Sequence, residues 1–181
     1  QKGMEPLALQ GSYAGAMGFP QFMPSSWRNL AVDFDGDRRI DLINNPVDAI
    51  GSIANYFKGN GWRTGEPVVV RARLSGQTYD AATSTELQTV STLGTLANQG
   101  LTPRTALTLP ATTAASGIRL QGMNGGEFWI GFNNFYVITR YNRSILYAMA
   151  AVQLSQALEA AKQERDQAAA PVAATGVSLL P

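Results

Sequence analysis

The chain has 181 residues, of which 45 % are hydrophobic and 15 % are charged, a balance that suffices for one packed domain or two small lobes and argues against wholesale disorder. Its net charge of +1 gives no broad electrostatic case for binding nucleic acid or an anionic membrane. It has no cysteine and no histidine, which excludes disulfides, zinc held by those residues, and Ser/His/Asp or Cys/His catalysis within the chain.

The N-terminal third is predicted to be helical with long loops. Residues 11–27 read GSYAGAMGFPQFMPSSW, in which both prolines suit the start of a helix. We therefore expect a loop, a short helix at Pro20–Met23 and a second helix from Pro24 onward with a serine as its N-cap. Apolar residues at helical spacing predict a further helix over residues 49–59, which two glycines end.

The middle of the chain is predicted to mix strands with one helix. Residues 68–74 are β-branched and partly alternating, which is typical of a strand. Residues 83–99 carry apolar side chains at a helical period and are expected to form a helix. Short strands are expected at residues 106–109 and 117–120, and an aromatic strand at residues 128–132.

The C-terminal part is predicted to be one long helix. Residues 135–158 are expected to begin as a loop and continue as a helix that runs to about residue 170. After Pro171 the composition predicts a disordered tail.

An acidic loop between the second and third predicted helices is a candidate metal site. Asp33, Asp35 and Asp37 alternate, so their carboxylates can point into one space, where like charges repel unless a cation lies between them. Dense hard oxygen ligands select Ca²⁺. The order resembles that of an EF-hand loop, in which the backbone carbonyl of Arg39 would be a further ligand.

The loop departs from the standard twelve-residue EF-hand in three places. A glycine is at the fourth position, Arg38 is at the sixth position, and Asn44 is at the twelfth, where a bidentate carboxylate is usual. We therefore expect a longer loop that Asp48 closes as a ligand, with a solvated acidic turn as the alternative.

Three blocks of sequence in a fixed order resemble the lytic transglycosylase B family, which cleaves murein. They read GSYAGAMGFPQFMPSSW, then VDFDGDRRIDLINNPVDAIGSIANYFKGNGW, then NNFYVITRYNRSILYAMAAV. The resemblance implies a periplasmic enzyme with a lysozyme-like core and a structural calcium site. It also implies cleavage of the β-1,4 bond between N-acetylmuramic acid (MurNAc) and N-acetylglucosamine (GlcNAc), with formation of 1,6-anhydroMurNAc by attack of the sugar's own hydroxyl.

With this resemblance, the expected fold class is α+β and mainly α. Residues 1–65 would form part of the lysozyme-like core, with the EF-hand-like loop at 33–48, and residues 66–126 a small α/β insertion. Residues 127–158 would return to the core with the long helix, and residues 159–181 would form the helix end and the tail.

The resemblance also assigns a sugar-binding groove, which needs aromatic faces for sugar C–H surfaces and amide or hydroxyl groups for the N-acetyl groups. The residues that match the family's groove are Ser12, Gln21, Met23, Tyr56, Asn134, Tyr136, Tyr141 and Asn142.

The family's catalytic glutamate is expected upstream of the first block, so no catalytic residue is expected on this chain, and the chain alone is expected to be inactive. Possible partners are peptidoglycan glycan strands and the N-terminal half of the same enzyme, which could carry an outer-membrane anchor. The alternative is a non-catalytic peptidoglycan-binding module.

Overall fold

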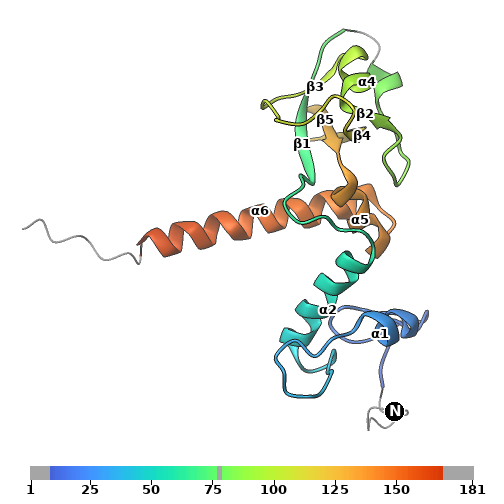
Figure 1. Cartoon of the computed structure of the whole chain (residues 1–181), viewed down its shortest axis with the longest axis vertical. Coiled ribbons are helices and arrows are strands. Elements are labelled where there is room, and N and C mark those ends of the chain that lie inside the picture. The colour runs from blue at the N-terminus through green and yellow to red at the C-terminus, as the bar shows by residue number, and fades with distance from the viewer. Residues whose placement is uncertain (1–8, 77–78, 169–181) are drawn as a thin grey trace, which may run out of the picture.

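The computed structural model describes residues 9–76 and 79–168. These residues form helices and one antiparallel sheet, which confirms the α+β class. The tail that the sequence predicts after Pro171 lies outside the described residues. In Figure 1 the sheet lies at the top, α1 and α2 lie at the bottom, and α5 lies between them.

The first two helices both begin at a proline. Helix α1 spans Pro24–Leu30 and helix α2 spans Pro46–Gly59. The side chain of Asn45 accepts hydrogen bonds from the amides of Val47 and Asp48, so α2 begins three residues earlier than predicted. The N-cap of α1 is Met23 and no side chain caps it, so the prediction of a serine cap is wrong.

The predicted helix at Pro20–Met23 is also wrong, because this segment is a turn. The amides and carbonyls of Met17 and Phe22 pair with each other at 3.0 and 3.1 Å, so the chain closes here as a turn between two bridged residues.

The sheet has five strands in the order β2-β4-β5-β1-β3, and every neighbouring pair is antiparallel. Its strands are β1 (Val69–Leu74), β2 (Ser91–Thr92), β3 (Leu101–Pro103), β4 (Ala114–Gly122) and β5 (Gly125–Gly131). The predicted strands at 68–74, 117–120 and 128–132 are confirmed. Because β5 pairs with both β1 and β4, the sheet extends past residue 126, where the sequence placed the end of the insertion.

The helix predicted over residues 83–99 is mostly absent. Only α4 (Leu93–Asn98) is helical there, and a short helix α3 (Tyr79–Ala82) precedes the segment. The amide of Ser84 donates to the carbonyl of Gly117, and the amide of Val90 donates to the hydroxyl of Ser116. These amides therefore bond to β4 and not to carbonyls within a helix. The strand predicted at 106–109 is also wrong, since this segment packs on the sheet as irregular backbone and β3 pairs with β1 instead.

Two helices follow the sheet, where the sequence predicted a loop and one helix. They are α5 (Asn133–Tyr141) and α6 (Ile145–Ala168). Ser144 separates them, because its hydroxyl accepts the amide of Tyr147 and its carbonyl accepts that of Ala148. Within residues 9–76 and 79–168, no helix is long and apolar enough to cross a membrane.

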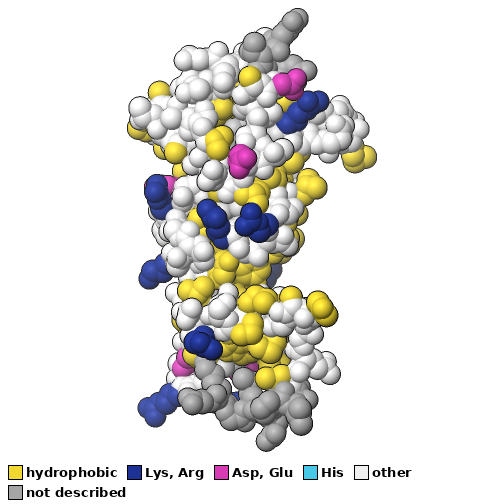
Figure 2. All heavy atoms as spheres, turned by 90° about the vertical axis from the view of Figure 1, so that its right-hand side faces the viewer, with side chains coloured by type: hydrophobic (Ala, Val, Ile, Leu, Met, Phe, Trp, Pro, Cys, Tyr) yellow, Lys and Arg dark blue, Asp and Glu magenta, His cyan; other side chains and the backbone are white. Residues whose placement is uncertain are grey.

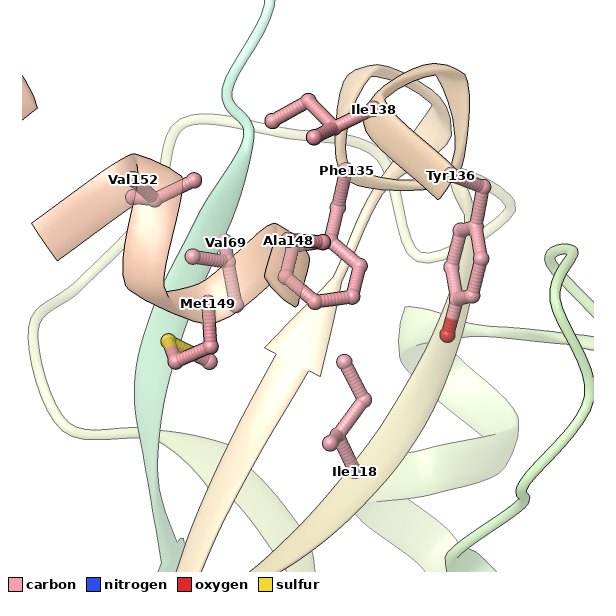
Figure 3. Packing of buried hydrophobic residues seen from close by; sticks show 8 residues of the cluster. All are labelled: Val69, Ile118, Phe135, Tyr136, Ile138, Ala148, Met149 and Val152. Atoms are coloured by element: carbon pink, nitrogen blue, oxygen red, sulfur yellow. The ribbon is translucent and has the colours of Figure 1, made fainter. Parts of the chain in front are cut away.

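The main core lies between the sheet and helices α5 and α6 (Figure 3). Phe135 is fully buried and its ring points between β5 and α6. The other buried members of this cluster are Val69, Ile118, Tyr136, Ile138, Ala148, Met149 and Val152. A second cluster packs α4 on the sheet, and a third joins α1, α2 and the acidic loop.

We predict that Phe135→Ala lowers the free energy of unfolding by about 3–5 kcal/mol, because it removes a fully buried ring and leaves a cavity. Leu154→Ala is the control, since the side chain of Leu154 is 61 % exposed on α6 and its loss should change stability by less than about 0.5 kcal/mol. Urea unfolding followed by circular dichroism measures both. Equal stability of the two variants would show that this interface does not hold the fold.

Candidate functional site

Aromatic rings from three distant segments meet where the first helices approach the end of α5. The rings of Tyr56 and Tyr141 lie edge to face with centroids 5.2 Å apart, and Phe22 lies 5.6 Å from Tyr56. Phe57 and Trp62 stack at 5.8 Å and extend the group. We call these five residues the ring cluster.

Both tyrosine hydroxyls of the ring cluster donate to backbone carbonyls across the fold. That of Tyr56 donates to the carbonyl of Arg140 at 2.8 Å, and that of Tyr141 donates to the carbonyl of Pro20. Burial raises the pKa of Tyr56, and the positive charge of Arg140 partly opposes this rise. Burial, with smaller contributions from Tyr147 and Tyr56, raises the pKa of Tyr141 to about 12. The Tyr141 hydroxyl therefore stays protonated, and a donor, at neutral pH.

The turn at residues 17–22 is held against the end of the acidic loop. The amide of Phe19 donates to the carbonyl of Leu42 at 2.8 Å. Gly18 has a φ of 72°, and a Cβ added there would lie 2.4 Å from the oxygen of Leu42, so only glycine fits. Gln21 also has a positive φ, of 48°, and its side-chain amide donates to the carbonyl of Gly18.

Six of the eight predicted groove residues have exposed or half-buried side chains, and four of these lie in the ring cluster or flank Phe22 in the sequence. Tyr56 and Tyr141 belong to the cluster, and Gln21 and Met23 flank Phe22 with exposed side chains. Ser12 is exposed and its hydroxyl accepts the amide of Ala16. Asn142 is exposed directly after α5, next to Tyr141.

The other two predicted groove residues, Asn134 and Tyr136, are buried in the described structure. Asn134 is fully buried, and its amide accepts the N–H of Arg63 and donates to the carbonyls of Arg63 and Glu66. Tyr136 is 4 % exposed and packs in the main core, where burial raises its pKa to about 12. Both side chains hold α5 in place and do not face solvent.

The acidic loop brings three of its predicted ligands together. Carboxylate oxygens of Asp33, Asp35 and Asp37 all lie within 4.8 Å of one another. Arg38 has a φ of 71° and donates its amide to Asp33 at 2.7 Å, so it makes the sharp turn that a glycine makes at this position in an EF-hand. A hydrogen bond from the Asn45 amide, then one from the backbone of Asp37, lowers the pKa of Asp35. The loop thus suits a hard divalent cation.

Asp48 has a different place from the one predicted. Its side chain is fully buried, and its two carboxylate oxygens accept the amides of Phe34 and Asp41, each at 2.8 Å. It therefore ties the two arms of the loop together and is not among the three converging carboxylates. Arg39 donates its amide to Asp37.

Comparison with known proteins identifies the family. Residues 1–156 match the family model described as transglycosylase SLT domain. The chain belongs to the transglycosylase SLT domain family. It is 49 % identical over 158 residues to membrane-bound lytic murein transglycosylase B of Escherichia coli K12, a match that covers 87 % of this chain and 42 % of that protein.

Solved structures of lytic transglycosylases share the fold of this SLT domain. SltB1 of Pseudomonas aeruginosa is 47 % identical with a TM-score of 0.83, over 90 % of this chain and 53 % of that one. Escherichia coli Slt35 in complex with calcium is 49 % identical with a TM-score of 0.76, over 87 % and 48 %. SltB3 of P. aeruginosa in complex with NAG-NAM-pentapeptide is 36 % identical with a TM-score of 0.68, over 83 % and 40 %. This SLT domain chain therefore spans about half the length of these relatives.

The described glutamates of the chain make no side-chain hydrogen bond or ion pair with the ring cluster. Glu127 pairs with Arg71 at 2.9 Å, and Glu66 lies 3.5 Å from Arg63. The remaining three are Glu86, Glu159 and Glu164, of which the last two lie exposed on α6. No sequence signal beyond the family blocks points to the ring cluster as a group, because Phe22 and Tyr141 meet the rings of α2 only through the docking of the turn at residues 17–22 and of α5.

We predict that Asp48→Asn lowers the free energy of unfolding by about 1–3 kcal/mol, since an amide NH₂ group would replace one of two buried acceptors and face a backbone N–H. Asp80→Asn is the control, because the side chain of Asp80 is 75 % exposed in a surface ion pair. Thermal unfolding compares the two. A melting temperature of Asp48→Asn equal to that of the control would contradict the structural role.

Proposed function

We propose that this chain carries the substrate-binding part of a peptidoglycan lytic transglycosylase. The reaction would cleave the β-1,4 bond between MurNAc and GlcNAc and form 1,6-anhydroMurNAc. The observation that carries the proposal is the ring cluster with its exposed polar flank, in a chain of the SLT domain family. The murein named for the E. coli relative and the NAG-NAM-pentapeptide bound to SltB3 support peptidoglycan as the substrate.

The proposed sugar contacts are those predicted groove residues that are not buried. Half-buried rings offer apolar faces to sugar C–H groups, as Tyr56 and Tyr141 would do. The side chains of Gln21, Asn142 and Ser12 offer amide and hydroxyl groups to N-acetyl groups and ring hydroxyls, and Met23 adds an adaptable apolar contact.

The catalytic acid of the proposed reaction would come from outside this sequence. The reaction needs a carboxylic acid that protonates the leaving oxygen of the glycosidic bond, and the resulting carboxylate then takes the proton of the C6 hydroxyl of MurNAc as that oxygen attacks C1. In the described residues, Glu66 and Glu127 have arginine partners, and Glu164 lies near the end of α6. Glu86 and Glu159 line pockets next to Arg140 and next to Phe57 and Trp62, and neither forms a hydrogen bond or ion pair with the ring cluster. We propose that the N-terminal half of the enzyme supplies this acid, and that the whole enzyme works in the periplasm.

We further propose that the acidic loop binds one structural Ca²⁺. The ligands would be the carboxylates of Asp33, Asp35 and Asp37 and the carbonyl of Arg39, in EF-hand order. The calcium complex of Slt35, whose sequence is 49 % identical, supports this choice of cation. The bound ion would neutralise three like charges in the loop that also carries Leu42, and so stabilise the turn that carries Gln21.

The calcium proposal predicts that Ca²⁺ at a hundred times its dissociation constant raises the free energy of unfolding by about 2.7 kcal/mol. Asp35→Asn should abolish most of this gain, because Asp35 supplies a central ligand and its side chain is exposed. Asp166→Asn, on α6, is the matched control and should keep it. Calorimetry that detects no heat of binding at millimolar Ca²⁺ would contradict the proposal.

The groove proposal predicts that Tyr56→Ala weakens binding of chitotetraose to this chain by about tenfold, equivalent to about 1.4 kcal/mol. Leu158→Ala, exposed on α6, should bind like the parent chain. Isothermal titration measures the affinity, and circular dichroism confirms that both variants fold. Unchanged affinity in a folded Tyr56→Ala variant would place Tyr56 in the core and not in the groove.

A further inference from the structure

A polar pocket of about 240 Å³ includes Arg140, whose carbonyl accepts the hydroxyl of Tyr56, and has no role in the proposed glycan contacts. It is bounded on one side by residues 85–88 and on the other by the end of α5 and the turn after it. The residues that line it are Thr85, Glu86, Leu87, Gln88, Arg140 and Arg143.

Both walls of the pocket are fixed by hydrogen bonds. The buried hydroxyl of Ser116 accepts the amide of Val90 at 2.7 Å and donates to the carbonyl of Gln88 at 3.3 Å, which holds the first wall against β4. In the second wall, the amide of Ser144 donates to the carbonyl of Asn142 at 2.7 Å, and the hydroxyl of Ser144 accepts the amide of Tyr147. The pocket is thus formed by two segments that the fold holds opposite each other.

The pocket carries charges of both signs that have no ion-pair partner. Within the described residues, no opposite charge lies within 4 Å of Arg140, Arg143 or Glu86, although other exposed arginines such as Arg71 and Arg119 are paired. Two guanidinium groups suit a carboxylate, and a carboxylate suits an ammonium group. A ligand that fits both would hold a carboxylate and an amine a few ångströms apart, as a peptide does.

The pocket is connected to the ring cluster through α5. The carbonyl of Arg140 accepts the hydroxyl of Tyr56. The positive charge of the Arg140 side chain partly opposes the rise that burial causes in the pKa of Tyr56. Arg143 follows Tyr141 by two residues. Figure 2 shows basic side chains at the middle of the face that it draws, at the height at which Figure 1 places α5. Arg140 thus belongs to the pocket by its side chain and contacts the ring cluster by its carbonyl.

We propose that this pocket binds the peptide stem of peptidoglycan, with a stem carboxylate at Arg140 and Arg143 and a free amino group at Glu86. This inference rests on the proposed glycan-binding function and adds a second part of the same substrate. It assigns to Arg143 a preference for peptide-bearing over bare glycan, which the ring cluster alone does not provide.

The experiment measures the affinity of the parent chain and of Arg143→Gln for two ligands by isothermal titration. One ligand is GlcNAc–MurNAc-pentapeptide, and the other is chitobiose, a neutral disaccharide without peptide. Arg143→Gln should lose about tenfold in affinity for the first, because it removes a charge-assisted hydrogen bond, and keep its affinity for the second. Glu86→Gln should weaken binding of the peptide-bearing ligand when the amino group of the peptide is free. It should not change binding of the same ligand when that amino group is acetylated.

Arg73→Gln is the matched control, since Arg73 is an exposed arginine of β1 outside the pocket, and it should bind both ligands like the parent chain. If Arg143→Gln binds both ligands as the parent does, or weakens both equally, the peptide assignment is overturned while the glycan function stands. If the parent chain binds neither ligand, the proposed function is overturned, and the inference with it.

Discussion

The hydroxyl of Tyr141, bonded to the carbonyl of Pro20, joins residues that are 121 positions apart in the sequence. It docks the end of α5 on the turn at residues 17–22, and the bond from Tyr56 to Arg140 docks α2 on the same helix end. These two bonds hold the rings of Phe22, Tyr56 and Tyr141 together. Tyrosine hydroxyls are protonated at neutral pH, and partial burial raises the pKa of both Tyr56 and Tyr141, so both stay donors into alkaline solution.

The acidic loop also holds the turn at residues 17–22, on which α5 docks. Leu42 is fully buried and its carbonyl receives the amide of Phe19, so the shape of the loop sets the position of the turn that carries Gln21. The buried carboxylate of Asp48 fixes that shape, and the three converging carboxylates at the exposed end oppose it by mutual repulsion. A divalent cation in the loop would therefore act on the substrate-binding part through Leu42, without contact to the sugar.

Local signals in the sequence were enough for some elements and for the converging aspartates. Strands β1, β4 and β5 follow from β-branched and aromatic runs, and the order of Asp33, Asp35 and Asp37 follows from their alternation. Residues 83–92 could not be predicted, because their apolar spacing is helical while their amides bond to β4, far along the chain. The burial of Asn134 could not be predicted either, since its partners come from residues 63–66 and only the fold brings them together.

The central claim is that the ring cluster and its exposed flank form a binding surface for N-acetylated glycan. Nuclear magnetic resonance of the isotope-labelled chain, titrated with chitotetraose, tests it most directly because each backbone amide reports separately. The account predicts that the largest shifts fall on residues 18–23, on Tyr56 and on Tyr141 and Asn142, with few changes in β1 to β5. Shifts confined to the sheet, or none at saturating chitotetraose, would contradict it.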